Sequence, residues 1–129
     1  MIGYINLGTN DIGRATTFYD ALFAVVGAAR MMEFPTGAVA YGIDWAKPMI
    51  AVGPPYDGGA ATVGNGSMVA LVMDTRAHVD ALHAKALDLG GADEGAPGVR
   101  GDDGPQAFYG AYFRDLDGNK LCAFRVGPA

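Results

Sequence analysis

Apolar and polar residues alternate at the start of the chain. In residues 2–9, Ile5 and Leu7 share one face of an extended segment. Tyr4 and Asn6 fall on the other face, because successive side chains of a strand point to opposite sides. The pattern predicts a short strand that packs Ile5 and Leu7 beneath a helix and leaves Tyr4 and Asn6 on the opposite face.

A helical pattern follows this strand, and the same order returns in the second half. Asp11 has the side chain of a helix N-cap, and Gly27 ends the pattern. Residues 67–73 predict a second strand, with Asp74 in the cap region of a second helix that ends at Gly90. The apolar residues that mark the two helices are Ala15, Phe18, Tyr19, Leu22, Val79, Leu82 and Leu87.

The two halves repeat at a period of 63–64 residues. In the first half, 16 residues separate Asp11 from Gly27, and in the second, 16 residues separate Asp74 from Gly90. Further strands are expected after each helix, at about 28–34, 37–44 and 48–53, then at about 91–94, 107–114 and 119–126. Each half is therefore predicted to fold as β-α-β-β-β.

Two glycine-rich segments carry no apolar periodicity. The first lies at mid-chain and predicts module one at 1–53, a linker at 54–66 and module two at 67–129. The second, residues 94–106, predicts a long surface loop with enough glycine to close as a lid. A sheet with one helix has one face uncovered, so two such modules side by side would leave a concave face for a ligand.

The paired modules, the helix segment FYDALF and the segment FRDLDGNKLCAF resemble the vicinal oxygen chelate superfamily. That group contains glyoxalase I, bleomycin-resistance proteins, extradiol dioxygenases and methylmalonyl-CoA epimerase. The resemblance runs from Tyr4 to Phe124. It implies an α+β fold in which two βαβββ modules form a cup-shaped, glyoxalase-like half-barrel, and it implies a homodimer.

The resemblance also implies where metal enzymes of this superfamily carry their His, Gln or Glu ligands. The matching positions in this sequence are Tyr4, Met68, Cys122 and a position near Ile50. A divalent first-row metal prefers imidazole or carboxylate donors, which none of these residues supplies. We therefore expect no metal site and no cofactor.

Strand alternation then selects the residues that face the cup. The predicted ligand-binding residues are Tyr4, Asn6, Met68, Tyr112, Arg114, Cys122 and Phe124. Tyr112 and Arg114 belong to this set only if the last hairpin has a regular register. A lining of aromatic and sulfur-containing side chains suits a flat or apolar small molecule, and the same side chains also serve as core fillers.

Other residues with chemical potential have simpler interpretations. His78 and His83 lie five residues apart, roughly 140° around a helix, which predicts a partly exposed helix surface rather than a metal pair. Asp115 and Asp117 suit a tight hairpin turn and lack the spacing of a calcium loop. Cys122 has no histidine placed as a base, so a buried and inert cysteine is expected.

Composition narrows the class of protein. Half of the 129 residues are apolar and 18% are charged, as in a globular protein. No apolar run is long enough to cross a membrane, no secretory signal is evident, and a single cysteine excludes an internal disulfide. The cytoplasm is the expected compartment. A net charge of −5 argues against nucleic acid as a partner.

Three functions remain open from the sequence. The first is a metal-free member of the superfamily that binds a small molecule in the cup. The second is an enzyme, a metal-independent glyoxalase-type lyase or one of dioxygenase-related activity, in which Tyr4, Cys122 or Arg114 replaces the metal, although no catalytic residue is identified. The third is a dimeric interaction module with a filled cup. An open cavity of several hundred Å³ would favour the first two.

Overall fold

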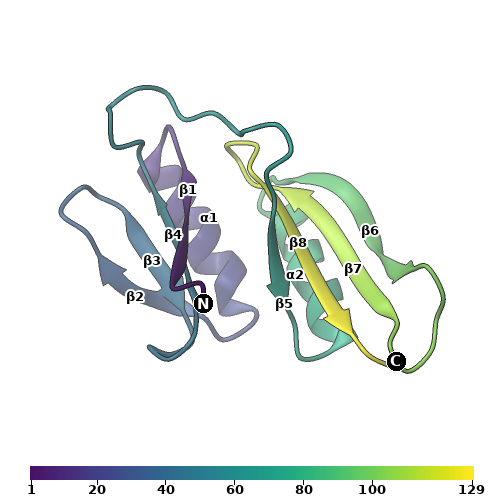
Figure 1. Cartoon of the computed structure of the whole chain (residues 1–129). Helices are drawn as coiled ribbons and strands as arrows, with labels where there is room; N and C mark the ends of the chain where they lie inside the picture. Colours follow the sequence, from purple (N-terminus) through teal and green to yellow (C-terminus); the bar gives the residue numbers. More distant parts are fainter.

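Strands and helices follow the order β-α-β-β-β twice along the chain, which confirms the predicted pair of modules (Figure 1). The computed structural model describes all of residues 1–129. The first module contains β1 (Tyr4–Gly8), α1 (Ile12–Ala24), β2 (Ala29–Glu33), β3 (Val39–Gly42) and β4 (Met49–Gly53). The second contains β5 (Val69–Val72), α2 (Arg76–Asp88), β6 (Ala92–Arg100), β7 (Phe108–Arg114) and β8 (Lys120–Val126).

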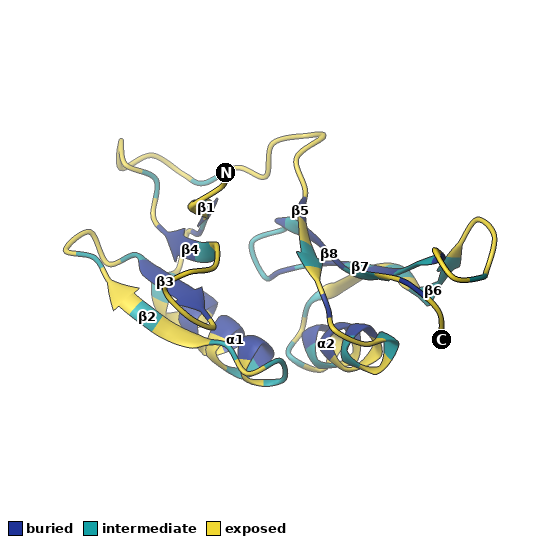
Figure 2. Cartoon of the chain, turned by 60° about the horizontal axis from the view of Figure 1, so that its bottom comes forward, coloured by how far each residue is buried: buried dark blue, intermediate teal, exposed yellow.

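Each module forms its own four-stranded sheet with the same topology. The strand orders are β1-β4-β3-β2 and β5-β8-β7-β6, with the first pair of each sheet parallel and the others antiparallel. β1 and β5 are edge strands that do not pair with each other, so the two sheets do not join into a closed barrel. Figure 2 shows α1 and α2 on the same side of the two sheets, where they contact each other. The opposite faces carry no helix.

The two helices begin at different kinds of cap. The Asp11 carboxylate accepts a hydrogen bond from the Arg14 backbone N–H at 3.0 Å, as predicted. The prediction of Asp74 for the second helix is wrong, because Thr75 is the cap and its hydroxyl accepts from the His78 N–H at 3.1 Å. Thr75 has the extended backbone that brings its side chain over the first turn, whereas Asp74 lies one residue too early.

The helices bury their apolar stripes against the sheets in one continuous core. Eighteen buried residues from both modules make up this core. Phe18 and its repeat partner Leu82 are both fully buried, as their matching positions predict. Because the core crosses the junction, neither module closes its apolar face alone.

The predicted loop at 94–106 is wrong over its first half, because β6 continues to Arg100. This strand pairs with β7 through register shifts at Asp93/Gly95 and Gly95/Gly98. Pro97 is tolerated because β6 lies at the sheet edge, where a missing N–H removes no ladder bond. The glycines and the proline therefore mark bulges in an edge strand rather than a long loop.

The turn between β7 and β8 fastens the two modules together. The Tyr19 hydroxyl, from α1, donates to Asp115 Oδ2 at 2.6 Å. Asn119 Nδ2 donates to the same oxygen and to the Gly8 carbonyl of β1, each at 2.9 Å. These three side chains, which we call the Asp115 cluster (Tyr19, Asp115 and Asn119), are buried. Burial, and then the Asp115 charge, raise the pKa of Tyr19, so its proton stays in the cluster.

No helix of the chain has the length and apolar character that crossing a membrane requires.

Candidate ligand-binding face

The helix-free face of the second sheet gathers most of the predicted ligand-binding residues. Tyr112 stands opposite Cys122 in the β7–β8 ladder, and Arg114 stands opposite Lys120. The register is regular along the whole hairpin, as the predicted set required. Opposed residues point to the same side of a sheet. We call this surface the module-two face; it comprises Arg100, Phe108, Tyr112, Arg114, Lys120, Cys122 and Phe124.

Two cations frame the ring of Tyr112. The Arg100 guanidinium carbon lies 5.5 Å from the centroid of this ring and the Lys120 ammonium 5.6 Å from it, both within cation–π range. Arg100 is held in place because it donates to the carbonyls of Gly98 and Ala96, at 2.9 and 2.7 Å. A guanidinium has five N–H donors, so others remain free for a ligand.

Glycine leaves room for the aromatic rings on this face. A Cβ added to Gly110 would lie 2.6 Å from the Phe108 ring, which stacks on Phe124 with centroids 5.3 Å apart and planes 7° apart. A Cβ added to Gly95 would lie 3.1 Å from the Tyr112 ring, and the φ of Gly95, +155°, is itself unfavourable for other residues. The rings of Phe108 and Tyr112 therefore lie close to the backbone at these two glycines.

The charge of this face is opposite to that of the whole chain. Arg100, Arg114 and Lys120 supply three cations, and Glu94 is the carboxylate that pairs with Arg114. The Arg114 guanidinium lowers the pKa of Glu94, which keeps this ion pair intact down to acidic pH. Arg100 and Lys120 have no carboxylate in salt-bridge contact. In a chain of net charge −5, this surface is suited to an anion.

Cys122 and Tyr112 are protonated at neutral pH. Cys122 is 1% exposed, as predicted, and burial raises the pKa of its thiol. Burial also raises the pKa of Tyr112, and the neighbouring Cys122 adds to that rise. Neither group is a thiolate or phenolate that would attack a substrate or accept a proton. The arrangement is suited to binding by stacking and charge.

The remaining predicted residues lie outside this face. Tyr4 and Asn6 stand opposite Met49 and Ala51 on the helix-free face of the first sheet, where both are exposed. Met68 is exposed just before β5 begins. The single chain therefore divides the predicted site between two sheets, with Tyr112, Arg114, Cys122 and Phe124 together on one of them.

The positions that the resemblance assigns to metal ligands do not fit a metal. Tyr4, Met68 and Cys122 supply a phenol, a thioether and a buried thiol of raised pKa. Ile50 stands opposite Ile5, on the side of the sheet that α1 covers. No group of three or more His, Cys, Asp or Glu side chains is placed to hold a metal ion. The donor set thus disagrees with the metal chemistry of the superfamily.

His83 corrects a prediction about the helix surface. Its side chain is buried, with the residue 5% exposed, and its Nε2 lies 3.0 Å from Asp93 Oδ1. The ring packs edge-on to Phe113 of β7. His83 follows Leu82 on the stripe of α2 that meets the sheet, and Asp93 satisfies its ring nitrogen, so burial leaves no polar group unpaired.

Sequence reasoning missed Arg100 and Lys120. Lys120 is two residues before Cys122, so the alternation that selected Cys122 and Phe124 also places Lys120 on their face. Arg100 was hidden because its segment was expected to be a loop. Its position depends on the pairing of β6 with β7, a tertiary contact without a local signal.

A separate apolar cavity of about 380 Å³ lies between the two sheets. It is lined from β1, β3, β4, β5 and the end of α1. None of the seven predicted ligand-binding residues lines it.

Many solved structures are similar to this chain, including the following three. A glyoxalase/bleomycin resistance protein from Albidiferax ferrireducens T118 is 32% identical, with a TM-score of 0.84, and the match covers 97% of this chain and 98% of that one. A hypothetical protein from S. aureus is 27% identical, with a TM-score of 0.72, covering 97% and 92%. A lactoylglutathione lyase from Agrobacterium tumefaciens shares the fold, at 21% identity and a TM-score of 0.64, covering 97% and 92%. No family model and no curated protein matches the sequence.

Proposed function

This chain belongs to the glyoxalase/bleomycin resistance/dioxygenase superfamily, and we propose that it binds a small, flat, negatively charged molecule on the module-two face. The observation that carries the proposal is that the Arg100 and Lys120 cations both lie close to the Tyr112 ring, 5.5 and 5.6 Å from its centroid. The aromatic surface of Tyr112 and of the Phe108–Phe124 stack contacts a planar ring. The two cations pair with its acidic group.

Binding without chemistry is the better-supported form of this proposal. A glyoxalase-type lyase needs a group that accepts a proton near neutral pH. The pKa values of Tyr112 and Cys122 are raised, which keeps both groups protonated, and Arg114 is engaged by Glu94 and by the Gly118 carbonyl. The face offers cations and aromatic surface, and its carboxylate, Glu94, is engaged by Arg114, which lowers its pKa.

A second copy of the chain completes the site in this proposal. In the single chain the module-two face is open to one side, whereas ligand sites are concave and bury most of the ligand. Tyr4 and Asn6 lie exposed on the helix-free face of the other sheet. In a homodimer, the first sheet of one copy would face the second sheet of the other and bring these residues to the ligand.

Calorimetric titration with 2-naphthoate, a flat aromatic carboxylate, tests the proposal. We expect saturable binding that weakens as salt is added, and no binding of the cation 2-naphthylmethylamine. The double variant R100A/K120A should lose roughly a hundredfold or more in affinity, because each of the two charged contacts is worth about 1.5–3 kcal/mol.

The matched control is R125A/K85A, which removes the same charge elsewhere. Arg125 stands opposite Tyr109, whose hydroxyl bonds to Asp80 of α2, so Arg125 lies on the helix side of the sheet. Lys85 lies on α2 itself. The control should retain wild-type affinity. Equal losses in both double variants, or preference for the cationic probe, would contradict the proposal.

A further inference from the structure

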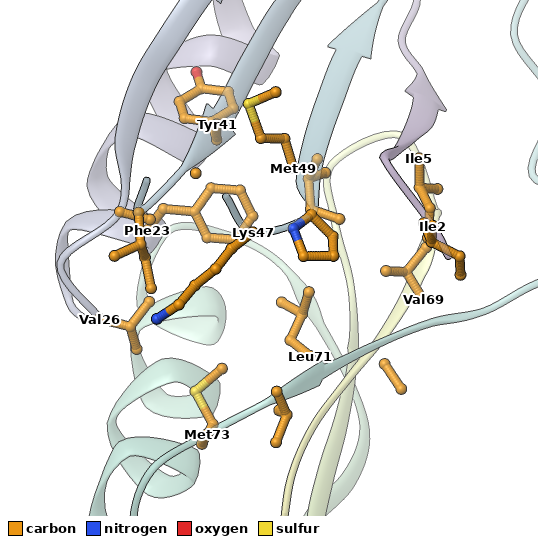
Figure 3. A pocket seen from close by; sticks show the side chains of 17 residues that line it. Ile2, Ile5, Phe23, Val26, Tyr41, Lys47, Met49, Val69, Leu71 and Met73 are labelled. Atoms are coloured by element: carbon orange, nitrogen blue, oxygen red, sulfur yellow. The ribbon is translucent and has the colours of Figure 1, made fainter. Parts of the chain in front are cut away.

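The apolar cavity between the sheets is independent of the module-two face, with which it shares no residue (Figure 3). Of the 17 residues that line it, 14 are hydrophobic. Its volume of about 380 Å³ is within the range of small-molecule sites. An apolar cavity this size, open to solvent, is a site for a ligand with matching apolar surface.

The lining is aliphatic rather than aromatic. Figure 3 shows Ile5 and Ile2 along one wall, with Val69 of β5 near them. Phe23 and Tyr41 also belong to the lining, yet they are 4% and 2% exposed, so they offer little ring surface. The Tyr41 hydroxyl donates to Asp20 at 2.8 Å and is already satisfied. A flexible alkyl chain fits such walls better than a flat ring does.

Lys47 is the charged residue of the lining. In Figure 3 its ammonium group extends toward Val26, across the space between the walls. Its ion pair with Asp44 is long, at 3.8 Å, and both side chains are at least half exposed. An exposed pair of this kind contributes little, so the ammonium group is available to an incoming acid.

From the aliphatic walls and Lys47, we propose that this cavity binds an alkyl chain that carries a carboxylate or another acidic head group. The alkyl chain lies against the aliphatic residues of β1, β4 and β5, and the head group pairs with Lys47 at the opening. This site would act beside the one proposed above, for a ligand of different shape.

A second copy of the chain is the competing occupant. β1 and β5 are edge strands, each paired on one side only. The Met73 N–H donates to the Phe124 carbonyl of β8, so the N–H and C=O groups of Ala70 and Val72 point away from β8, toward the open edge. A strand of a second copy added at this edge would cover the cavity. The experiment must therefore measure ligand binding and oligomeric state together.

Titration with decanoate and with decanol, followed by NMR, tests the proposal. Decanoate should bind saturably, and decanol about two- to fivefold more weakly, the range expected for one exposed ion pair. Lys47→Ala should bring decanoate down to the affinity of decanol without changing decanol. Lys85→Ala, on α2, is the matched control and should change neither. Equal affinity for the two probes in the wild type would overturn the head-group assignment.

Leu71→Trp narrows the cavity and should abolish binding of both probes, with circular dichroism to check that the variant folds. If it does not fold, Val72→Trp replaces it, because Val72 is an exposed residue of the lining. Undiminished decanoate binding in a folded variant would overturn the proposal. A second result would also overturn the proposal: the wild type is a dimer that binds neither probe, and Leu71→Trp dissociates this dimer. That result would assign the cavity to the second copy.

Discussion

The two modules share one topology and differ in where their strand cations point. In module one, Arg30 of β2 faces the helix, where it pairs with Asp20 of α1 at 2.8 Å. In module two, Arg100 and Lys120 point away from the helix and frame Tyr112. The repeat therefore preserves the scaffold while the placement of the cations differs, and the anion site that we propose lies on the second sheet alone.

The β3–β4 and β7–β8 hairpin turns also differ between the two modules. The turn between β3 and β4 is exposed, and its Asp44 accepts one local hydrogen bond, from the Ala46 N–H. The corresponding turn between β7 and β8 holds Asp115, which is buried and binds Tyr19 of the other module. The second aspartate of this turn, Asp117, accepts a hydrogen bond from the Asn10 N–H at 3.0 Å, so both aspartates of the turn bind groups of module one.

The largest effect is expected when the Asp115 cluster is broken. Asp115→Ala should lower the free energy of unfolding by about 3 kcal/mol, because the buried Tyr19 hydroxyl loses its acceptor and Asn119 Nδ2 keeps only its bond to the Gly8 carbonyl. Asp44→Ala, the equivalent change in module one, should cost less than about 0.5 kcal/mol. Urea unfolding of both variants makes the comparison. Similar losses would show that the two turns are equally structural.

Two tyrosines of the first module provide a smaller test. Tyr19→Phe should cost about 2 kcal/mol, because it removes a hydrogen bond to a buried carboxylate that links the modules. Tyr41→Phe should cost about 1 kcal/mol, since Asp20 keeps its bonds to Arg30 and is partly exposed. Thermal and urea unfolding would rank the pair. A larger loss for Tyr41→Phe would contradict the importance of the inter-module contact.

The two modules are also expected to contribute differently to the loss of unfolding free energy in acid, through Asp20 in module one and Asp93 in module two. Hydrogen bonds from Arg30 lower the pKa of Asp20, and the Gly95 N–H followed by His83 lowers that of Asp93. A carboxyl whose pKa is lower folded than unfolded stabilises the protein above its unfolded value, about 4, and loses that contribution as pH falls through the folded value. Unfolding free energy should therefore decline below about pH 4.

Asp20→Asn should flatten this decline more than Asp93→Asn, because Asp20 accepts from both Arg30 and Tyr41. Urea titrations at several pH values between neutrality and acid would measure it. A decline that neither variant changes would place the acid sensitivity elsewhere, for example in Glu94 or Asp103, whose pKa values are also lowered by arginines.

Local pattern predicted the fold because each element carries its own signal. The Asp11 cap, the buried stripes and the regular β7–β8 register all follow from neighbours in sequence. The strand predicted at about 91–94 is β6, but the prediction ends too early, because pairing with β7 overrides the turn signals of Gly95 and Pro97. The Asp115 cluster was not predictable, since Tyr19 and Asp115 are 96 residues apart. Arg100 and the inter-sheet cavity likewise depend on contacts that form only in the folded chain.

A crystal structure with 2-naphthoate would test the location of anion recognition most directly. The account predicts the carboxylate within hydrogen-bond distance of Arg100 or Lys120, and the ring against Tyr112 or the Phe108–Phe124 stack. A naphthoate bound in the cavity between the sheets, or on the helix-free face of module one without contact to Arg100 and Lys120, would contradict it.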